Sequence, residues 1–223
     1  MPATSTKAAV SVSGVTARKN RNGTHMADND CRSNLISIAT PLFSEKGFNG
    51  VSVREIASLA KVNISMISYY FGGKEGLYAA VLNEQFAVLH RVEEIALLDA
   101  DPLKKIEYYV RATVARYRQN PYLLRFYTSE LTNPTQCFAT IVKPAIQGVV
   151  KTLQELFADG LSHHKFREGL DPTDTALALA GMINFYFLLE PATGELVDHS
   201  PQRDEELIRH IMDIFSNGVL KRQ

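Results

Sequence analysis

The side chains best suited to bind another molecule gather between residues 51 and 74. The segment VSVREIASLAKVNISMISYYF, residues 51–71, carries hydroxyl, amide and aromatic groups, which a short helix would expose if Ile67 and Phe71 face inward. Hydroxyl and amide groups can contact bases or phosphates, and apolar groups can pack on thymine methyls. Lys74 opens the next helical pattern, where its ammonium group and the free backbone N–H groups can bind a phosphate. The candidate nucleic-acid contacts are Asn63, Ile64, Ser65, Met66, Ser68, Tyr69 and Lys74.

Other reactive side chains form weaker patterns. Adjacent His163 and His164 have no cysteine or carboxylate cluster at a metal-ligand spacing, which favours a solvated loop over a metal site. Cys137 as a thiol sensor lacks a nearby basic residue, since Lys143 is the closest in sequence. No Ser/His/Asp grouping, glycine-rich phosphate loop or paired carboxylates indicate an enzyme. We therefore expect no catalytic residue, metal or cofactor.

Short helices must position the candidate contacts. Apolar residues at helical spacing, beginning with Leu35, predict a first helix from Cys31 to Gly47. Ser52 with Glu55 three residues later has the spacing of a capping box and begins a second helix. Asn63 is a suitable N-cap for a third helix, which ends at residues 72–73, and a fourth pattern runs over residues 74–97. Two short helices joined by a tight turn can enter a DNA major groove, although a small helical subdomain with solvated polar groups fits the same spacing.

The rest of the chain repeats one helix-start signal. A capping residue followed by proline occurs five times, and proline suits the first position of a helix. The predicted helices cover 102–119, 121–132, 134–159, 172–190 and 202–219, with a bend at Pro144. We find no convincing strand, so the prediction is an all-α fold of about nine helices.

Composition limits the partners. The 223 residues include 24 Lys+Arg and 24 Asp+Glu, and 45% are hydrophobic, which is typical of a globular protein and excludes binding by bulk positive charge. The net charge is +2 over residues 1–30, +1 over 31–90 and −3 over 91–223. We expect residues 1–29 to be a flexible tail, either a basic arm for phosphates or an inert extension. No membrane span, secretory signal or disulfide framework is indicated, and we expect a cytoplasmic protein.

Residues 34–82, NLISIATPLFSEKGFNGVSVREIASLAKVNISMISYYFGGKEGLYAAVL, resemble the N-terminal helix-turn-helix domain of the TetR/AcrR family of bacterial transcriptional regulators. The resemblance implies a recognition helix at 64–70, phosphate contacts from Ser52, Tyr70 and Lys74, and a homodimer on a roughly palindromic operator. The family often has Gly where this chain has Lys61, and commonly Tyr where it has Ser68. The absence of Lys or Arg between residues 63 and 70 argues against bidentate guanine recognition by this helix.

The C-terminal part is expected to sense a small molecule and to dimerise. Aromatic and polar residues at Tyr109, Arg125, Tyr127 and Glu130 are candidate contacts for an unknown effector, because such pockets combine aromatic walls with few polar groups. Helix 172–190 is apolar nearly all round and needs burial on two sides. The resemblance implies that it pairs with helix 202–219 and their symmetry mates, whereas an interior hairpin of a monomer is the alternative. The candidate interface residues are Ala178, Gly181, Phe185, Ile208, Ile211 and Phe215.

These expectations divide the chain into a tail at 1–29, a DNA-binding domain at 30–90 and a sensing and dimerisation domain at 91–223. The expected function is a homodimeric repressor that a small, substantially apolar ligand releases from operator DNA, with helix 74–97 transmitting the change. The alternative is an all-α small-molecule binding protein or enzyme that uses the N-terminal domain for another purpose.

Overall fold

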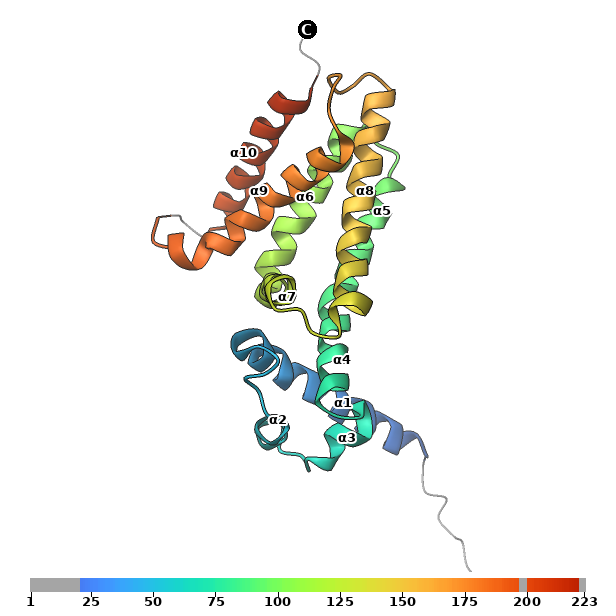
Figure 1. Cartoon of the computed structure of the whole chain (residues 1–223), viewed down its shortest axis with the longest axis vertical. Helices are drawn as coiled ribbons and strands as arrows, with labels where there is room; N and C mark the ends of the chain where they lie inside the picture. The colour runs from blue at the N-terminus through green and yellow to red at the C-terminus, as the bar shows by residue number, and fades with distance from the viewer. Residues whose placement is uncertain (1–20, 197–199, 221–223) are drawn as a thin grey trace, which may run out of the picture.

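The computed structural model describes residues 21–196 and 200–220, and over these residues the fold is all-α. Figure 1 shows a small N-terminal unit, made by α1 to α3 and the start of α4, below a larger body of packed helices. Helix α7 lies between the two. The helices are α1 (Arg21–Lys46), α2 (Val53–Leu59), α3 (Ser65–Phe71), α4 (Lys74–Ala87), α5 (Glu93–Ala96), α6 (Pro102–Gln119), α7 (Pro121–Thr132), α8 (Lys143–Ser162), α9 (Pro172–Thr193) and α10 (Pro201–Val219), with a 3₁₀ helix η1 (Val88–Val92) and a π-helix η2 (Phe138–Val142).

Four of the five predicted proline starts are confirmed. The side chains of Asp101, Asn120, Asp171 and Ser200 each accept a hydrogen bond from a backbone N–H in the first turn of α6, α7, α9 and α10. A carboxylate, amide or hydroxyl oxygen thus satisfies a donor that has no partner inside the helix. Three of these four helices also end at the predicted residue, and α9 extends three residues further, to Thr193.

The fifth proline start is wrong, because residues 133–137 form a turn. The Glu130 carboxylate accepts hydrogen bonds from the backbone N–H of Thr135 at 3.2 Å and from its hydroxyl at 3.0 Å. The Thr135 hydroxyl in turn accepts the N–H of Cys137 at 3.1 Å. These side-chain bonds replace the helical ones. Consequently α8 begins at Lys143, and Pro144 lies in its first turn instead of bending its middle.

Two further boundaries differ from the prediction. Helix α1 begins at Arg21, so residues 21–29 of the predicted tail are helical, while residues 1–20 lie outside the described part of the chain. No proline precedes Cys31 within α1, and a helix formed downstream can extend upstream at little cost. The predicted helix 74–97 is interrupted after Ala87 by η1. The interruption coincides with a change of core, since Phe86 belongs to the N-terminal cluster and Val92 to the C-terminal one.

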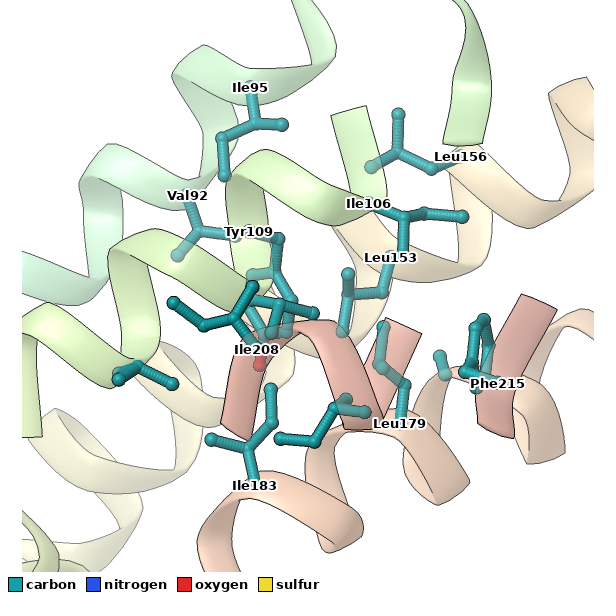
Figure 2. Packing of buried hydrophobic residues seen from close by; sticks show 14 of the residues in the cluster. Val92, Ile95, Ile106, Tyr109, Leu153, Leu156, Leu179, Ile183, Ile208 and Phe215 are labelled. Atoms are coloured by element: carbon teal, nitrogen blue, oxygen red, sulfur yellow. The ribbon is translucent and has the colours of Figure 1, made fainter. Parts of the chain in front are cut away.

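Two hydrophobic clusters organise the molecule. In the body, Val92, Ile106, Leu153, Ile183 and Phe215 come from η1, α6, α8, α9 and α10 and point toward one another (Figure 2). The N-terminal cluster buries residues of α1 to α4 but also takes side chains from α7, η2 and α8. The N-terminal unit therefore shares part of its core with the body. The residues that the body contributes are Leu123, Phe126, Cys137, Val142 and Ala145.

Candidate nucleic-acid interface and sensor cavity

The start of α2 is fixed by local bonds. The Ser52 hydroxyl accepts the backbone N–H of Glu55 at 3.1 Å, which is one half of the predicted capping box. The Glu55 carboxylate turns instead to Lys46 at the end of α1, 2.5 Å away, and this ammonium group lowers the pKa of Glu55. Ser52 is exposed and its hydroxyl hydrogen can still be donated to a phosphate. Arg54, also exposed in this first turn, is a cation that the sequence analysis did not select.

The turn between α2 and α3 explains one departure from the family pattern. Lys61 has a φ of 55°, in the left-handed region that favours glycine. The N–H groups of Lys61 and Val62 bond the carbonyls of Ser58 and Ala57 at 3.2 and 3.1 Å, which closes the end of α2. The chain thus keeps the turn that a glycine would make, with a lysine side chain exposed on it.

Helix α3 presents one face to solvent. Ile67 is buried beneath it and Phe71 is half-buried, so the predicted inner face is observed. Ile64, Ser65 and Ser68 are exposed, and Tyr69 is 73% exposed. The remaining candidates on this helix, Met66 and Tyr70, are half-buried.

Two further groups frame this face. The Asn63 oxygen accepts the N–H of Ser65 at 2.9 Å, which leaves the Asn63 NH₂ group as the free end of the amide. The Arg32 guanidinium of α1 lies 5.3 Å from the ring centre of Phe71, so a cation that the sequence analysis did not select also lies beside α3. In the sequence Arg32 is only one basic residue of the first predicted helix, and nothing there indicates that it lies beside Phe71.

Lys74 is held at the beginning of α4. Its ammonium nitrogen lies 4.5 Å from the ring centre of Phe48, which orients the side chain without neutralising it. Gly72 and Gly73, with φ values of 74° and 134°, let the chain reverse between α3 and α4. A Cβ at Gly76 would lie 1.8 Å from the Phe71 carbonyl oxygen, so only glycine permits this close approach of the two helices. Lys74 is therefore fixed relative to α3.

The body contains a partly open cavity of about 160 Å³ between η1, α6, α7, α8 and α9. Of the predicted ligand contacts, Tyr109 and Tyr127 line it. Arg125 lines a separate hollow of about 150 Å³. The rest of the cavity wall also includes Gly181, a predicted dimer contact, and consists of Leu89, Thr113, Arg116, Tyr117, Leu123, Ile146, Val149, Val150, Leu177, Ala180, Gly181 and Asn184.

Glu130, the fourth predicted ligand contact, lies outside both hollows. Its side chain is fully buried and accepts the Tyr78 hydroxyl at 2.8 Å as well as the two groups of Thr135. Since Tyr78 belongs to α4 and Glu130 to α7, this carboxylate joins the helix that starts at the N-terminal unit to a helix that lines the cavity. A second bond, from the Asn120 amide to the Gln85 side-chain oxygen at 2.8 Å, joins α7's start to α4.

The cavity's tyrosines are neutral hydrogen-bonding groups. Burial raises the pKa of Tyr109 to about 12, despite the opposing effect of the Thr113 hydroxyl. Burial also raises the pKa of Tyr117, whose hydroxyl donates to the Asn184 oxygen at 2.6 Å. Burial likewise raises the pKa of Tyr127, with Asn184 opposing the shift. The cavity thus combines phenol and amide groups with aliphatic walls.

The predicted dimer residues divide between surface and core. On α9, Ala178 and Gly181 are exposed and Phe185 is 60% exposed. On α10, in contrast, Ile208, Ile211 and Phe215 are buried in the core of the protomer, because that face of the helix packs on the body. The apolar surface of α10 that remains open is Ile214, which is 65% exposed.

Helix α9 is also the one helix in the described residues that is long and apolar enough to cross a membrane by length and composition. Its inner face, represented by Leu179 and Ile183, belongs to the core of the body, and its outer face is open.

The histidine and cysteine candidates have ordinary environments. The exposed His163 ring, just after the end of α8, lies 3.2 Å from an Asp159 oxygen of that helix, and the described residues contain no group of three potential metal ligands. Cys137 is buried, and burial raises the pKa of its thiol, which disfavours the reactive thiolate.

A three-helix unit with an exposed short helix, joined to a larger helical body with a cavity, defines the class of helix-turn-helix regulators with a separate sensing part. Residues 35–81 match the family model described as bacterial regulatory proteins, tetR family, and residues 102–215 match the model described as tetracyclin repressor-like, C-terminal domain. The chain belongs to the TetR family of DNA-binding transcriptional regulators. Since the family consists of regulators and not enzymes, the enzyme alternative is set aside.

Individual relatives agree with this assignment. The HTH-type transcriptional repressor NicS of Pseudomonas putida is 30% identical over 158 residues, covering 70% of this chain and 74% of NicS. Among solved structures, the ketosteroid transcriptional regulator KstR2 of Mycobacterium tuberculosis superposes with a TM-score of 0.71 at 18% identity, covering 86% of this chain and 95% of KstR2. FadR of Bacillus subtilis in complex with stearoyl-CoA gives a TM-score of 0.68 at 18% identity, covering 83% and 98%. These two structures share the fold.

Proposed function

We propose that the protein is a homodimeric repressor that binds a roughly palindromic operator and is released by a small molecule. The observation that carries the proposal is the exposed face of α3, which projects Ile64, Ser65, Ser68 and Tyr69 from a unit fixed by the buried Ile67. NicS is named a transcriptional repressor, which supports repression, as opposed to activation, for the present protein.

The proposed DNA contacts separate into two groups. Ser52, Tyr70 and Lys74 contact phosphates, and the groups from Asn63 to Tyr69, which lie just before α3 and along it, approach base edges in the major groove. The exposed groups on α3 are apolar, hydroxyl or amide groups, so recognition relies on adenine and thymine features more than on bidentate contacts to guanine.

Dimerisation is part of the proposed binding mechanism. The open apolar groups of α9 and α10, including Phe185 and Ile214, would be covered by the same groups of a second copy. A two-fold axis there would place two α3 helices on half-sites about 34–36 Å apart, one turn of duplex.

We propose that release passes through α7. A ligand in the cavity contacts Tyr127 on α7, and the same helix holds Tyr78 of α4 through Glu130. Helix α4 begins with Lys74, so a shift of α7 would move a phosphate contact. A ligand that binds the shifted state more tightly than the DNA-bound state lowers the affinity for the operator. The largest possible decrease equals the ratio of the ligand's affinities for the two states.

The domain limits follow as part of the proposal. Residues 30–90 bind DNA, with α1 extending back to Arg21, and residues 91–223 sense ligand and dimerise. We place this protein in the cytoplasm, where its operator DNA lies.

The test of DNA binding is a mobility-shift assay on the DNA upstream of the protein's own gene. Tyr69→Ala and Lys74→Ala should each weaken the specific complex about 5- to 150-fold, since one good contact contributes about 1–3 kcal/mol. Tyr108→Ala is the matched control, because Tyr108 is equally an exposed tyrosine but lies on α6. Sequence-specific binding unaffected by both changes would overturn the site assignment.

The test of dimerisation is light scattering. Phe185→Glu should give monomers, because a carboxylate would be buried without a partner in the interface. Leu97→Glu, at an exposed apolar residue outside α9 and α10, should leave the dimer intact. A dimer that survives Phe185→Glu would place the interface elsewhere.

A further inference from the structure

Arg116 differs from its neighbours on α6. Arg111 bonds the carboxylates of Glu107 and Glu205, and Arg118 bonds those of Asp204 and Glu190. The Arg116 side chain makes no hydrogen bond or ion pair within the described part of the chain, although it is half-buried and lines the cavity. One helix therefore carries two neutralised guanidinium groups and one that lacks an anion.

The surroundings of Arg116 make this unpaired cation unfavourable. Burial lowers the pKa of Arg116, the phenols of Tyr109 and Tyr117 favour its charge, and the cation of Arg91 opposes it. A guanidinium group nevertheless stays protonated in proteins. A partly buried cation with another cation nearby is costly unless an anion joins it.

The cavity also contains a second unsatisfied group. The Thr113 hydroxyl, one turn before Tyr117 on α6, is buried next to Tyr109 without a hydrogen bond of normal geometry. Native proteins rarely leave buried polar groups unpaired, so an unpaired hydroxyl at a cavity wall is a position where a water or ligand atom can bond. Arg116 and Thr113 both line the same cavity.

Cavity size limits what can bind. A protein cavity of about 150 Å³ holds one benzene molecule, and the present cavity has about 160 Å³. Ile146, Val149 and Val150 of α8 supply an aliphatic wall opposite the polar groups of α6. The space suits one ring or a short branched chain.

We propose that the effector is a small monocarboxylate, with a hydrocarbon part of one ring or a short branched chain, whose carboxylate pairs with Arg116. The inference rests on the proposed function of the cavity as the effector site, and it names the ligand class. The planar guanidinium group matches two carboxylate oxygens, and Tyr109 or Thr113 can donate a further bond. The hydrocarbon part then packs on α8 and α9.

The competing explanation is that water alone satisfies Arg116. Arg116 also borders an open hollow on its other side, together with Arg91 and Glu94. A guanidinium group solvated there would give the cavity no preference for acids over neutral molecules of equal shape. Selectivity between an acid and its amide therefore separates the two explanations.

The experiment is calorimetric titration of the full-length protein with benzoate and 3-methylbutanoate, each compared with its neutral amide. At least one acid should bind about 10- to 100-fold more tightly than its amide, the range expected for a hydrogen-bonded charge pair. Arg116→Met should abolish this preference, while Arg116→Lys should keep part of it because the charge remains. Arg111→Met, on the same helix but at an exposed pair, should leave it unchanged.

The outcomes separate this inference from the proposed function. If no acid binds in preference to its amide, or if the preference survives Arg116→Met, the ligand class is wrong, even if operator DNA is bound as proposed. If an acid binds selectively through Arg116 but does not release operator DNA, the ligand class stands and the proposed release mechanism fails. Circular dichroism of Arg116→Lys shows whether the site tolerates a change at this position.

Discussion

Removal of one hydroxyl group tests how the DNA-binding unit is joined to the body. The Tyr78 hydroxyl donates to the Glu130 carboxylate at 2.8 Å, and both side chains are buried. In Tyr78→Phe the carboxylate keeps only its bonds to Thr135. A hydrogen bond to a charged group contributes about 1.5–3 kcal/mol, and we expect a loss of about 2 kcal/mol in the free energy of unfolding.

The assay is urea unfolding followed by circular dichroism at pH 7. Protomer concentration must be fixed, because dimer formation would add to apparent stability. The corresponding fall in melting temperature is about 4–8 °C for a chain of this size. Tyr108→Phe removes a hydroxyl from an exposed tyrosine and should change stability by less than about 0.5 kcal/mol.

A double-mutant cycle isolates the bond itself. Tyr78→Phe, Glu130→Gln and the double variant should give a coupling energy of about 1 kcal/mol or more, because the two groups are in direct contact. A loss below about 0.5 kcal/mol in Tyr78→Phe, or coupling near zero, would refute the claim that this bond holds α4 to α7.

Three further predictions concern packing, backbone and pH. Gly160→Ala should lower the free energy of unfolding in urea by about 1–3 kcal/mol, because the new Cβ would lie 2.1 Å from the Phe166 ring. The control is Gly218→Ala, which should not lower the free energy of unfolding because the space around Gly218 is open. Lys61→Gly should raise the melting temperature by a few degrees, because it removes the left-handed strain of a φ of 55°, whereas unchanged or lower stability would contradict that account. The pKa of Tyr109, raised to about 12 from 10, means that the folded state holds this proton more tightly than the unfolded state. Stability should therefore fall by about 2–3 kcal/mol as pH rises from 10 to 12, and Tyr109→Phe should remove that part of the fall.

The sequence predicts elements whose causes are local. A capping oxygen with proline at the first helical position places the starts of four helices, because both effects act within one turn. The same signal fails at Pro134, where the carboxylate of Glu130 captures the backbone of Thr135. The sequence does not show that Glu130 bonds Tyr78, which lies 52 residues away along the chain. Without this partner, a buried-looking carboxylate beside aromatic residues was predicted as a ligand contact.

Tertiary relations explain the residues that sequence analysis missed. Arg116 is notable because it has no carboxylate partner among residues 21–196 and 200–220, while Arg111 and Arg118 on the same helix have theirs. All three look alike in a helical sequence pattern. Similarly, the apolar stripe of α10 indicates that this face is buried, but it does not indicate whether the face packs on the protomer or on a second copy. In the structure Ile211 packs in the core of the protomer.

The contact between α4 and α7 has the right strength for a switch. A ligand that lowers operator affinity 100-fold must favour the released state by about 2.7 kcal/mol. Rearranging the buried Tyr78–Glu130 bond together with the partly buried Asn120–Gln85 bond changes the free energy by about that amount. An exposed ion pair such as Lys46–Glu55 contributes less than about 1 kcal/mol and cannot supply it. If release operates as proposed, these two bonds are able to supply the free energy that it requires, and Tyr78→Phe should change the ligand's effect on operator affinity while leaving the exposed face of α3 intact.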